Sequence, residues 1–177
     1  MAAKKLSAAR GSSRGFTLVE LVVVILLVGI LAAIALPRFS SVDDDAHLAR
    51  AESIAGTFQS SVQLAHSVWQ LQAAGRPAEN LVVFGPAADG QLDFNANGWP
   101  SQQWFGALEA NPSTNNVADC ISVSNALLRS SINISLTSDA ELRPAYLGAG
   151  VCRYTFTDAP ALSFEYNSNT GEVSRNF

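Results

Sequence analysis

The sequence predicts an α+β fold in which one long N-terminal helix packs on a small antiparallel sheet. Three observations predict it: an apolar stretch near the N-terminus continues into a segment of helical periodicity, Gly75 and Pro77 stop that segment, and short strands with turn residues follow. A chain of 177 residues can bury one modest core. We therefore expect a basic segment over residues 1–15, a helix over residues 16–74 and a globular domain over residues 75–177.

The first part of the chain is basic, and the part that follows it is apolar. Residues 21–36, LVVVILLVGILAAIAL, contain no charge, and together with residues 16–20 they reach the length of about 20 residues that a membrane-spanning helix needs. Four basic residues precede this run: Lys4, Lys5, Arg10 and Arg14. Because positive residues stay on the cytoplasmic side, we expect residues 1–15 in the cytoplasm and the rest of the chain across the membrane.

Glu20 stands at the head of the apolar run and is unusual there. A carboxylate deep in a membrane costs about 2.5 to 3.5 kcal/mol, and less near the interface. Three interpretations of the segment compete: a secretory signal cleaved after the small residues around Ala33 and Ala35, a permanent anchor, or a leader cleaved before the apolar run. Only the last gives Glu20 a partner, because a cut between Gly15 and Phe16 creates an α-amino group one helical turn earlier.

That new amine could meet Glu20 of its own chain or of a neighbouring parallel helix in a low-dielectric bundle. In the second case the carboxylate sets the register between chains.

The segment resembles the N-terminus of type IV prepilins and the related pseudopilins. The resemblance rests on Arg14-Gly15, on the FTLVE sequence that begins at Phe16, and on the apolar run with Gly29 and Pro37. It implies cleavage after Gly15 by a prepilin peptidase, N-methylation of Phe16, and a role for Glu20 in recruiting and aligning subunits in a filament core. It also implies the type IV pilin fold.

A helix break is expected within the long helix. Pro37 lacks an amide proton and clashes with the carbonyl of Ala33, so the helix should kink or loosen there, and Gly29 adds a second weak point. The resemblance implies that the segment between such positions loses helical order when subunits pack into a pilus. A simple bend at the membrane exit is the alternative.

Beyond Pro37 the pattern is that of an amphipathic helix. One apolar stripe follows steps of four and three residues: Ala51, Ala55, Phe58, Val62, Ala65 and Trp69. The remainder predicts a hairpin, two short helices and three further strands, over residues 81–84 with 91–94, 101–109, 118–128, 152–157, 162–167 and 172–176. We expect the strands to pack as a small antiparallel sheet on the C-terminal half of the helix.

Cys120 and Cys152 are the cysteines of the chain, and neither lies in a CxxC pair or at metal spacing from a histidine. Export across the membrane favours a disulfide between them, which would close a loop of roughly 30 residues and contribute about 3 to 4 kcal/mol. Two unrelated buried thiols are the alternative. The family resemblance implies that the pair brackets a variable loop on the filament surface.

Nothing in the sequence predicts an enzyme, a cofactor or a strong metal site. Asp93, Asn95 and Asn97 match the first half of a calcium loop, but Trp104 stands where a bidentate Glu should close it, so they form only a weak calcium candidate. From Phe16 onward the chain carries 7 basic and 15 acidic residues, a net charge of -8 against -4 for the whole chain, which argues against a nucleic-acid partner.

The sequence therefore predicts a structural subunit of a type IV pilus, a homo-oligomer in a helical filament. The Asn97-Gly98-Trp99-Pro100 stretch and the closing strand-turn-strand FEYNSNTGEVS resemble the mannose-sensitive haemagglutinin (MSHA) branch, which implies adhesion and biofilm formation through an unknown surface or receptor. Expected partners are the prepilin peptidase and the inner-membrane pilus assembly machinery. The precursor is expected in the inner membrane and the filament outside a Gram-negative-type cell.

Two alternatives to a pilus subunit remain open. They are the major pseudopilin of a type II secretion system and a secreted or membrane-anchored ligand-binding protein.

Overall fold

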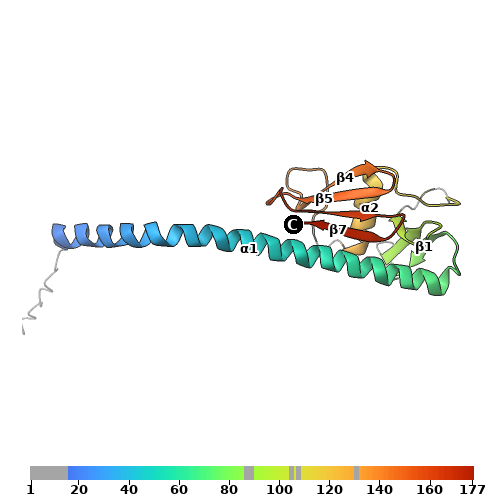
Figure 1. Ribbon diagram of the computed structural model, residues 1–177, viewed down its shortest axis with the longest axis horizontal. Helices are drawn as coiled ribbons and strands as arrows, with labels where there is room; N and C mark the ends of the chain where they lie inside the picture. The colour runs from blue at the N-terminus through green and yellow to red at the C-terminus, as the bar shows by residue number, and fades with distance from the viewer. Residues whose placement is uncertain (1–15, 86–89, 104–105, 107–108, 130–131) are drawn as a thin grey trace, which may run out of the picture. The chain divides into compact units, whose positions relative to one another are not determined.

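The computed structural model describes residues 16–85, 90–103, 106, 109–129 and 132–177, with the side chains of residues 35–41 left undescribed. The chain divides into two compact units, Met1–Asp43 and Asp44–Phe177, which are described separately below. The elements follow one another as a long helix, three strands, a second helix and four strands (Figure 1).

Helix α1 (Leu18–Gln72) is assigned without interruption across both Gly29 and Pro37. The helix assignment of the single chain therefore has no break at these positions, whereas a kink at Pro37 or Gly29 stays a prediction. A Cβ added at Gly29 would meet no other atom within 4 Å, so the space around this residue is open. Loss of helical order inside a filament stays a prediction.

The predicted membrane span over residues 16–36 extends into the residues whose side chains are not described. Of the helices as far as the structure describes them, none combines the length and the apolar character needed to cross a membrane.

The C-terminal part of α1 buries the stripe that the sequence predicted. All six residues, from Ala51 to Trp69, lie in the core of the Asp44–Phe177 unit. Phe58 is at its centre, with its ring 5.2 to 5.5 Å from the rings of Tyr154, Phe164 and Tyr166. Fully burying one large apolar side chain contributes about 1.5 to 3 kcal/mol to the stability of the folded state. This stripe therefore fixes which face of the helix meets the sheet.

The larger sheet has four antiparallel strands in the order β4-β5-β6-β7. They are β4 (Leu142–Gly148), β5 (Val151–Phe156), β6 (Ser163–Asn167) and β7 (Glu172–Asn176). The last three confirm predicted strands, whereas β4 was missed. Pro144 lowers the strand signal of that segment, but β4 is an edge strand, where proline is tolerated.

The smaller sheet joins β1 (Ala78–Val82), β2 (Gln91–Phe94) and β3 (Pro100–Gln102) in that order. The predicted hairpin is confirmed by the antiparallel β1–β2 pair, although residues 86–89 of its turn lie outside the described residues. The helix predicted over residues 101–109 is wrong at its start, because Ser101 and Gln102 belong to β3. The Ser101 hydroxyl donates to the Asp93 carbonyl oxygen at 3.2 Å across the strands.

Helix α2 (Val117–Leu127) confirms the helix predicted over residues 118–128. It begins with a capping box between Asn116 and Asp119. Cys120 in α2 and Cys152 in β5 form the disulfide that the sequence favoured, with their Cα atoms 5.7 Å apart.

Two buried tyrosines reinforce the packing between the helices and the sheets. The Tyr154 hydroxyl donates to the Cys120 carbonyl oxygen at 2.8 Å, and the Tyr166 hydroxyl donates to the Pro100 carbonyl oxygen at 2.7 Å. Burial raises the pKa of both hydroxyls, because a phenolate would lose its hydration there. Both tyrosines therefore remain donors at ordinary pH.

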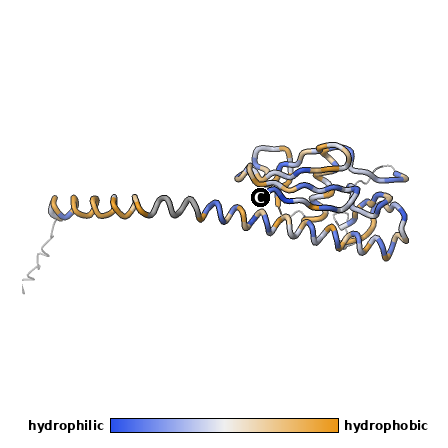
Figure 2. Tube along the Cα trace, viewed as in Figure 1, coloured by the Kyte–Doolittle hydropathy of each residue, from blue (hydrophilic) through white to orange (hydrophobic). Residues whose placement is uncertain are grey.

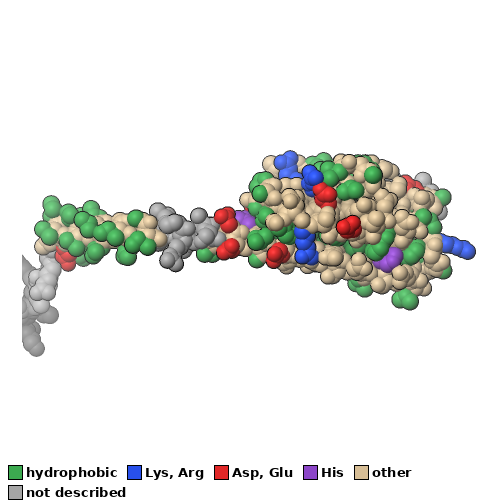
Figure 3. All heavy atoms as spheres, viewed as in Figure 1, with side chains coloured by type: hydrophobic (Ala, Val, Ile, Leu, Met, Phe, Trp, Pro, Cys, Tyr) green, Lys and Arg blue, Asp and Glu red, His purple; other side chains and the backbone are tan. Residues whose placement is uncertain are grey.

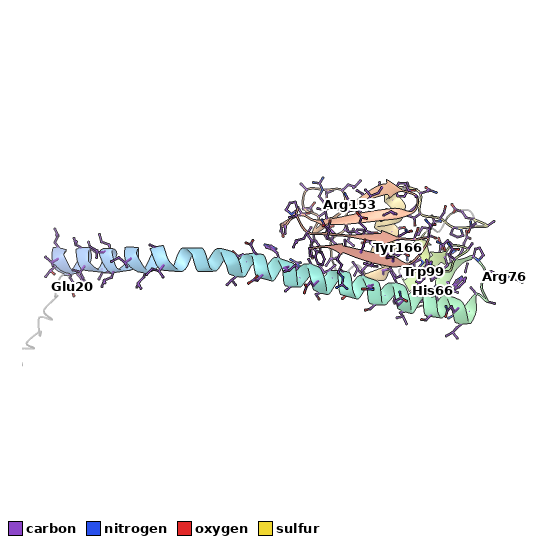
Figure 4. All side chains as sticks on the ribbon, in the orientation of Figure 1. Glu20, His66, Arg76, Trp99, Arg153 and Tyr166 are labelled. Atoms are coloured by element: carbon purple, nitrogen blue, oxygen red, sulfur yellow. A yellow bond between two sulfur atoms is a disulfide. The ribbon has the colours of Figure 1, made fainter. Side chains whose placement is uncertain are left out.

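An aromatic cluster anchors the end of α1 to the loop between β2 and β3. The His66 ring stacks on the Trp99 ring with centroids 3.9 Å apart, and it also stacks on Trp69 (Figure 4). His66 Nδ1 lies 2.7 Å from the Gly98 carbonyl oxygen, which can only accept, so this nitrogen is the donor. Gly98 has φ +77°, and a Cβ there would collide with the Trp69 ring, so only glycine fits.

Candidate assembly segment

The first turn of α1 is capped by Thr17. The backbone N–H of Glu20 donates to Thr17 Oγ1 at 3.2 Å, and Glu20 is the acidic residue of the first turn (Figure 4). Thr-x-x-Glu is the capping-box pattern, in which the hydroxyl accepts from the N3 amide and the glutamate can reach back toward the cap. Sequence reasoning missed this role of Thr17, although the TLVE spacing is its signal. A carboxylate at this position is also favoured by the helix macrodipole.

Phe16 lies immediately before the capped turn and exposes 83% of its surface. Gly15, the other residue of the predicted processing site, lies outside the described residues together with the rest of the basic segment. Because α1 begins at Leu18, an α-amino group on Phe16 would sit just outside the helix. Glu20 would then lie within about one helical turn of it.

The surface of α1 from Phe16 to Ile34 is apolar on every side. Its large apolar side chains, including the unbroken series from Leu21 to Val28, are each at least 45% exposed in the single chain. Figure 2 colours this part of the helix as hydrophobic beyond a hydrophilic patch in the first turn, and Figure 3 shows hydrophobic side chains along its visible face. Glu20 is its one charged residue. A helix that is apolar all round belongs in a membrane or inside a bundle of helices.

Two residues of the weak calcium candidate, Asp93 and Asn95, hydrogen-bond to backbone N–H groups through their side-chain oxygens. Asp93 Oδ1 accepts from the Asn80 N–H at 2.7 Å, and Asn95 Oδ1 accepts from the N–H groups of Asn97 and Trp99 at 3.0 and 3.1 Å. These oxygens therefore stabilise the backbone around β2. Throughout the described ranges, no group of three or more His, Cys, Asp or Glu side chains is placed to hold a metal ion.

Comparison with known proteins gives two findings. The prokaryotic N-terminal methylation motif matches residues 10–36. The chain is also 39% identical over 74 residues to the type IV narrow pilus major component of Thermus thermophilus, which covers 42% of this chain and 60% of that protein. The chain thus spans less than two thirds of the length of this relative. No solved structure matches.

Proposed function

We propose that this chain, a type IV pilin-like protein, is a structural subunit that polymerises through α1 into a surface filament. The observation that carries the proposal is the capped helix with an apolar surface on every side and a single carboxylate, Glu20, in its first turn. Such a surface is stable only in lipid or against other helices. The methylation motif over residues 10–36 supports the same assignment.

The precursor would be cut between Gly15 and Phe16 by a prepilin peptidase in the inner membrane, which would also methylate Phe16. Moving the apolar helix from lipid into a bundle brings little hydrophobic gain, because lipid tails are as apolar as the helix. Glu20 changes this balance. In the bundle its carboxylate would meet the Phe16 amine of a neighbouring subunit, and this pairing would fix the stagger between chains.

The exposed face of the C-terminal part of α1 supports packing beyond the apolar segment. From Ser53 to Gln72 the helix contains no Asp, Glu, Lys or Arg. Several hydroxyls on this face already donate to carbonyls of their own helix, as Thr57 does to Ser53 and Ser60 does to Gly56, both at 2.8 Å. Interfaces are depleted in charge, and polar groups that are already hydrogen-bonded are less costly to bury.

In this account the disulfide and the sheets face outward on the fibre, where the filament of an MSHA-like pilin would serve adhesion and biofilm formation on a Gram-negative-type cell. The name of the Thermus relative supports a major rather than a minor subunit. Its partners would be further copies of the chain and the inner-membrane assembly machinery.

A charge placed on the uncharged face of α1 tests the proposal. Leu64→Glu changes a side chain that is 51% exposed, so the folded monomer should tolerate it, whereas a filament would bury the new carboxylate without a partner. We expect the yield of fibres sheared from cells to fall at least about tenfold, since burying an unpaired charge costs several kcal/mol.

Leu136→Glu is the matched control for this variant. Leu136 is 54% exposed and lies outside α1, so its replacement adds the same charge to the globular part of the chain. Fibre yield should stay near that of the parent chain. Equal fibre yields from Leu64→Glu and the parent chain would contradict packing through this face.

A further inference from the structure

We propose that Asp45 of one copy of this chain pairs with Arg50 of the neighbouring copy, so that a second ion pair fixes the same stagger as Glu20. The inference rests on the proposed function, because it needs neighbouring copies in a filament. It starts from the sequence DDDAHLAR over residues 43–50, in which an acidic run is followed by Arg50 after little more than one helical turn. Ion pairs between helices set their alignment in the same way in coiled coils.

The axial distance between the two residues matches the stagger that the N-terminus would set. If Glu20 of one chain meets the Phe16 amine of the next, the chains are offset by four residues, or about 6 Å along the helix. In a helical filament all copies are equivalent, so the same offset applies at every residue. Asp45 and Arg50 are five residues apart, or about 7.5 Å. The two offsets differ by only about 1.5 Å, which a long arginine side chain can span.

Asp45 and Arg50 also lie on different sides of α1, as contact between equivalent copies requires. Five residues turn an α-helix through about 140°, so the two side chains cannot pair within one chain. In a heterologous interface, one side of each subunit meets the other side of the next, and the pair can therefore repeat along a fibre. Without the stagger, Asp45 would lie closest to Asp43 of the next chain, which shares the side of Arg50 because seven residues make nearly two turns. Like charges oppose that arrangement.

The single chain leaves both groups available for such a contact. Asp45 is exposed, and across the residues that the structure describes its side chain takes part in no hydrogen bond or ion pair. Arg50 Nη2 lies 2.5 Å from Glu141 Oε1, while 52% of the Arg50 side chain stays exposed. A guanidinium has five N–H donors, so it can hold Glu141 and still donate to a second carboxylate. Because Glu141 already orders the Arg50 side chain, a pair between chains costs less entropy.

Cysteines at both positions test the contact directly. In the double variant Asp45→Cys and Arg50→Cys, helix geometry places the two Cα atoms of one chain about 8.7 Å apart, beyond the roughly 7 Å that a disulfide can span. A new disulfide can therefore form only between chains. We expect oxidised, sheared fibres to give a ladder of dimers, trimers and higher multimers on non-reducing gels. Asp45→Cys with Glu172→Cys, an exposed position at the start of β7, is the control and should give no ladder.

An exchange of charges tests the same pair without cysteines. All variants of this series carry Glu141→Gln, so that Arg50→Glu meets no like charge at Glu141 of its own chain. Asp45→Arg or Arg50→Glu alone should lower the yield of sheared fibres about tenfold or more, because each brings two like charges together between chains. Both changes together restore an attractive pair and should return the yield to that of the Glu141→Gln chain. The amount of each chain in the membrane fraction should be equal on immunoblots.

Three results would overturn the pair between Asp45 and Arg50 while the parent chain still forms fibres. They are double-cysteine fibres without a ladder, single charge changes that form fibres at the Glu141→Gln yield, and a combined exchange that forms as few fibres as the single changes. Polymerisation through α1 would stand in each case. A parent chain that forms no fibres would overturn both this inference and the proposed function.

Discussion

Glu20→Ala is expected to prevent filament assembly while leaving the chain in the membrane. Without the carboxylate, the apolar helix enters lipid at lower cost, but in a bundle the Phe16 amine would be buried without its partner. Breaking a buried ion pair costs about 3 to 5 kcal/mol, and 1.4 kcal/mol is already tenfold in affinity. The yield of sheared fibres should therefore fall by more than about tenfold, with the amount of the chain in the membrane fraction unchanged on immunoblots.

Glu20→Gln separates the two roles that the structure allows for this residue. Glutamine can still complete the capping box with Thr17 but carries no charge. If charge pairing drives assembly, the Glu20→Gln variant should form as few fibres as the Glu20→Ala variant. If only the helix cap matters, the Glu20→Gln variant should form fibres at the parent yield. Glu172→Ala, an exposed glutamate at the start of β7, is the control and should leave the fibre yield unchanged. Normal fibre yield from Glu20→Ala would rule out the register role.

Cys120→Ser is expected to give the largest loss of stability in the globular unit. The disulfide closes a sequence separation of 32 residues and ties α2 to β5. In the chain-entropy model such a loop contributes about 3 to 4 kcal/mol. Both sulfur-bearing residues are fully buried, so the serine hydroxyl adds a further cost at this site. Urea unfolding of the full-length chain in detergent, followed by near-ultraviolet circular dichroism, measures the loss.

The double variant Cys120→Ala and Cys152→Ala is the control for the buried hydroxyl, because it removes the crosslink and adds no polar atom. It should retain most of the stability loss, and the reduced parent chain should behave in the same way. Equal free energies of unfolding for the parent chain under reducing and oxidising conditions would mean that the disulfide does not stabilise the fold.

The sequence was most informative where a single physical requirement repeats along the chain. The stripe from Ala51 to Trp69 could be predicted residue by residue, because a helix on a sheet must bury every third or fourth side chain. The strands β5 to β7 could be placed because the turn residues between β6 and β7 separate two runs of strand-forming residues. The cysteine pairing followed from there being only two cysteines and from the predicted export.

The features that sequence reasoning missed depend on contacts between distant segments. β4 forms despite Pro144 because the proline sits on an edge, and edge position is a property of the assembled sheet. The loops after β2 and after β6 are joined by the hydrogen bond from Asn97 Nδ2 to the Asn169 carbonyl oxygen, and no local pattern brings residues so far apart in the chain together. The spacing of Asp93 and Asn95 also gave no sign that Oδ1 of each residue accepts hydrogen bonds from backbone N–H groups.

The mass of the N-terminal peptide of the protein recovered from the cell surface tests the central claim most directly. The account predicts a chain that starts at Phe16 and carries one added methyl group on its α-amino nitrogen, which would give Glu20 its partner. A chain that starts at Leu36, or one that retains Met1, would contradict the account. The first would remove the apolar helix altogether, and the second would leave Glu20 without the amine on which assembly is proposed to depend.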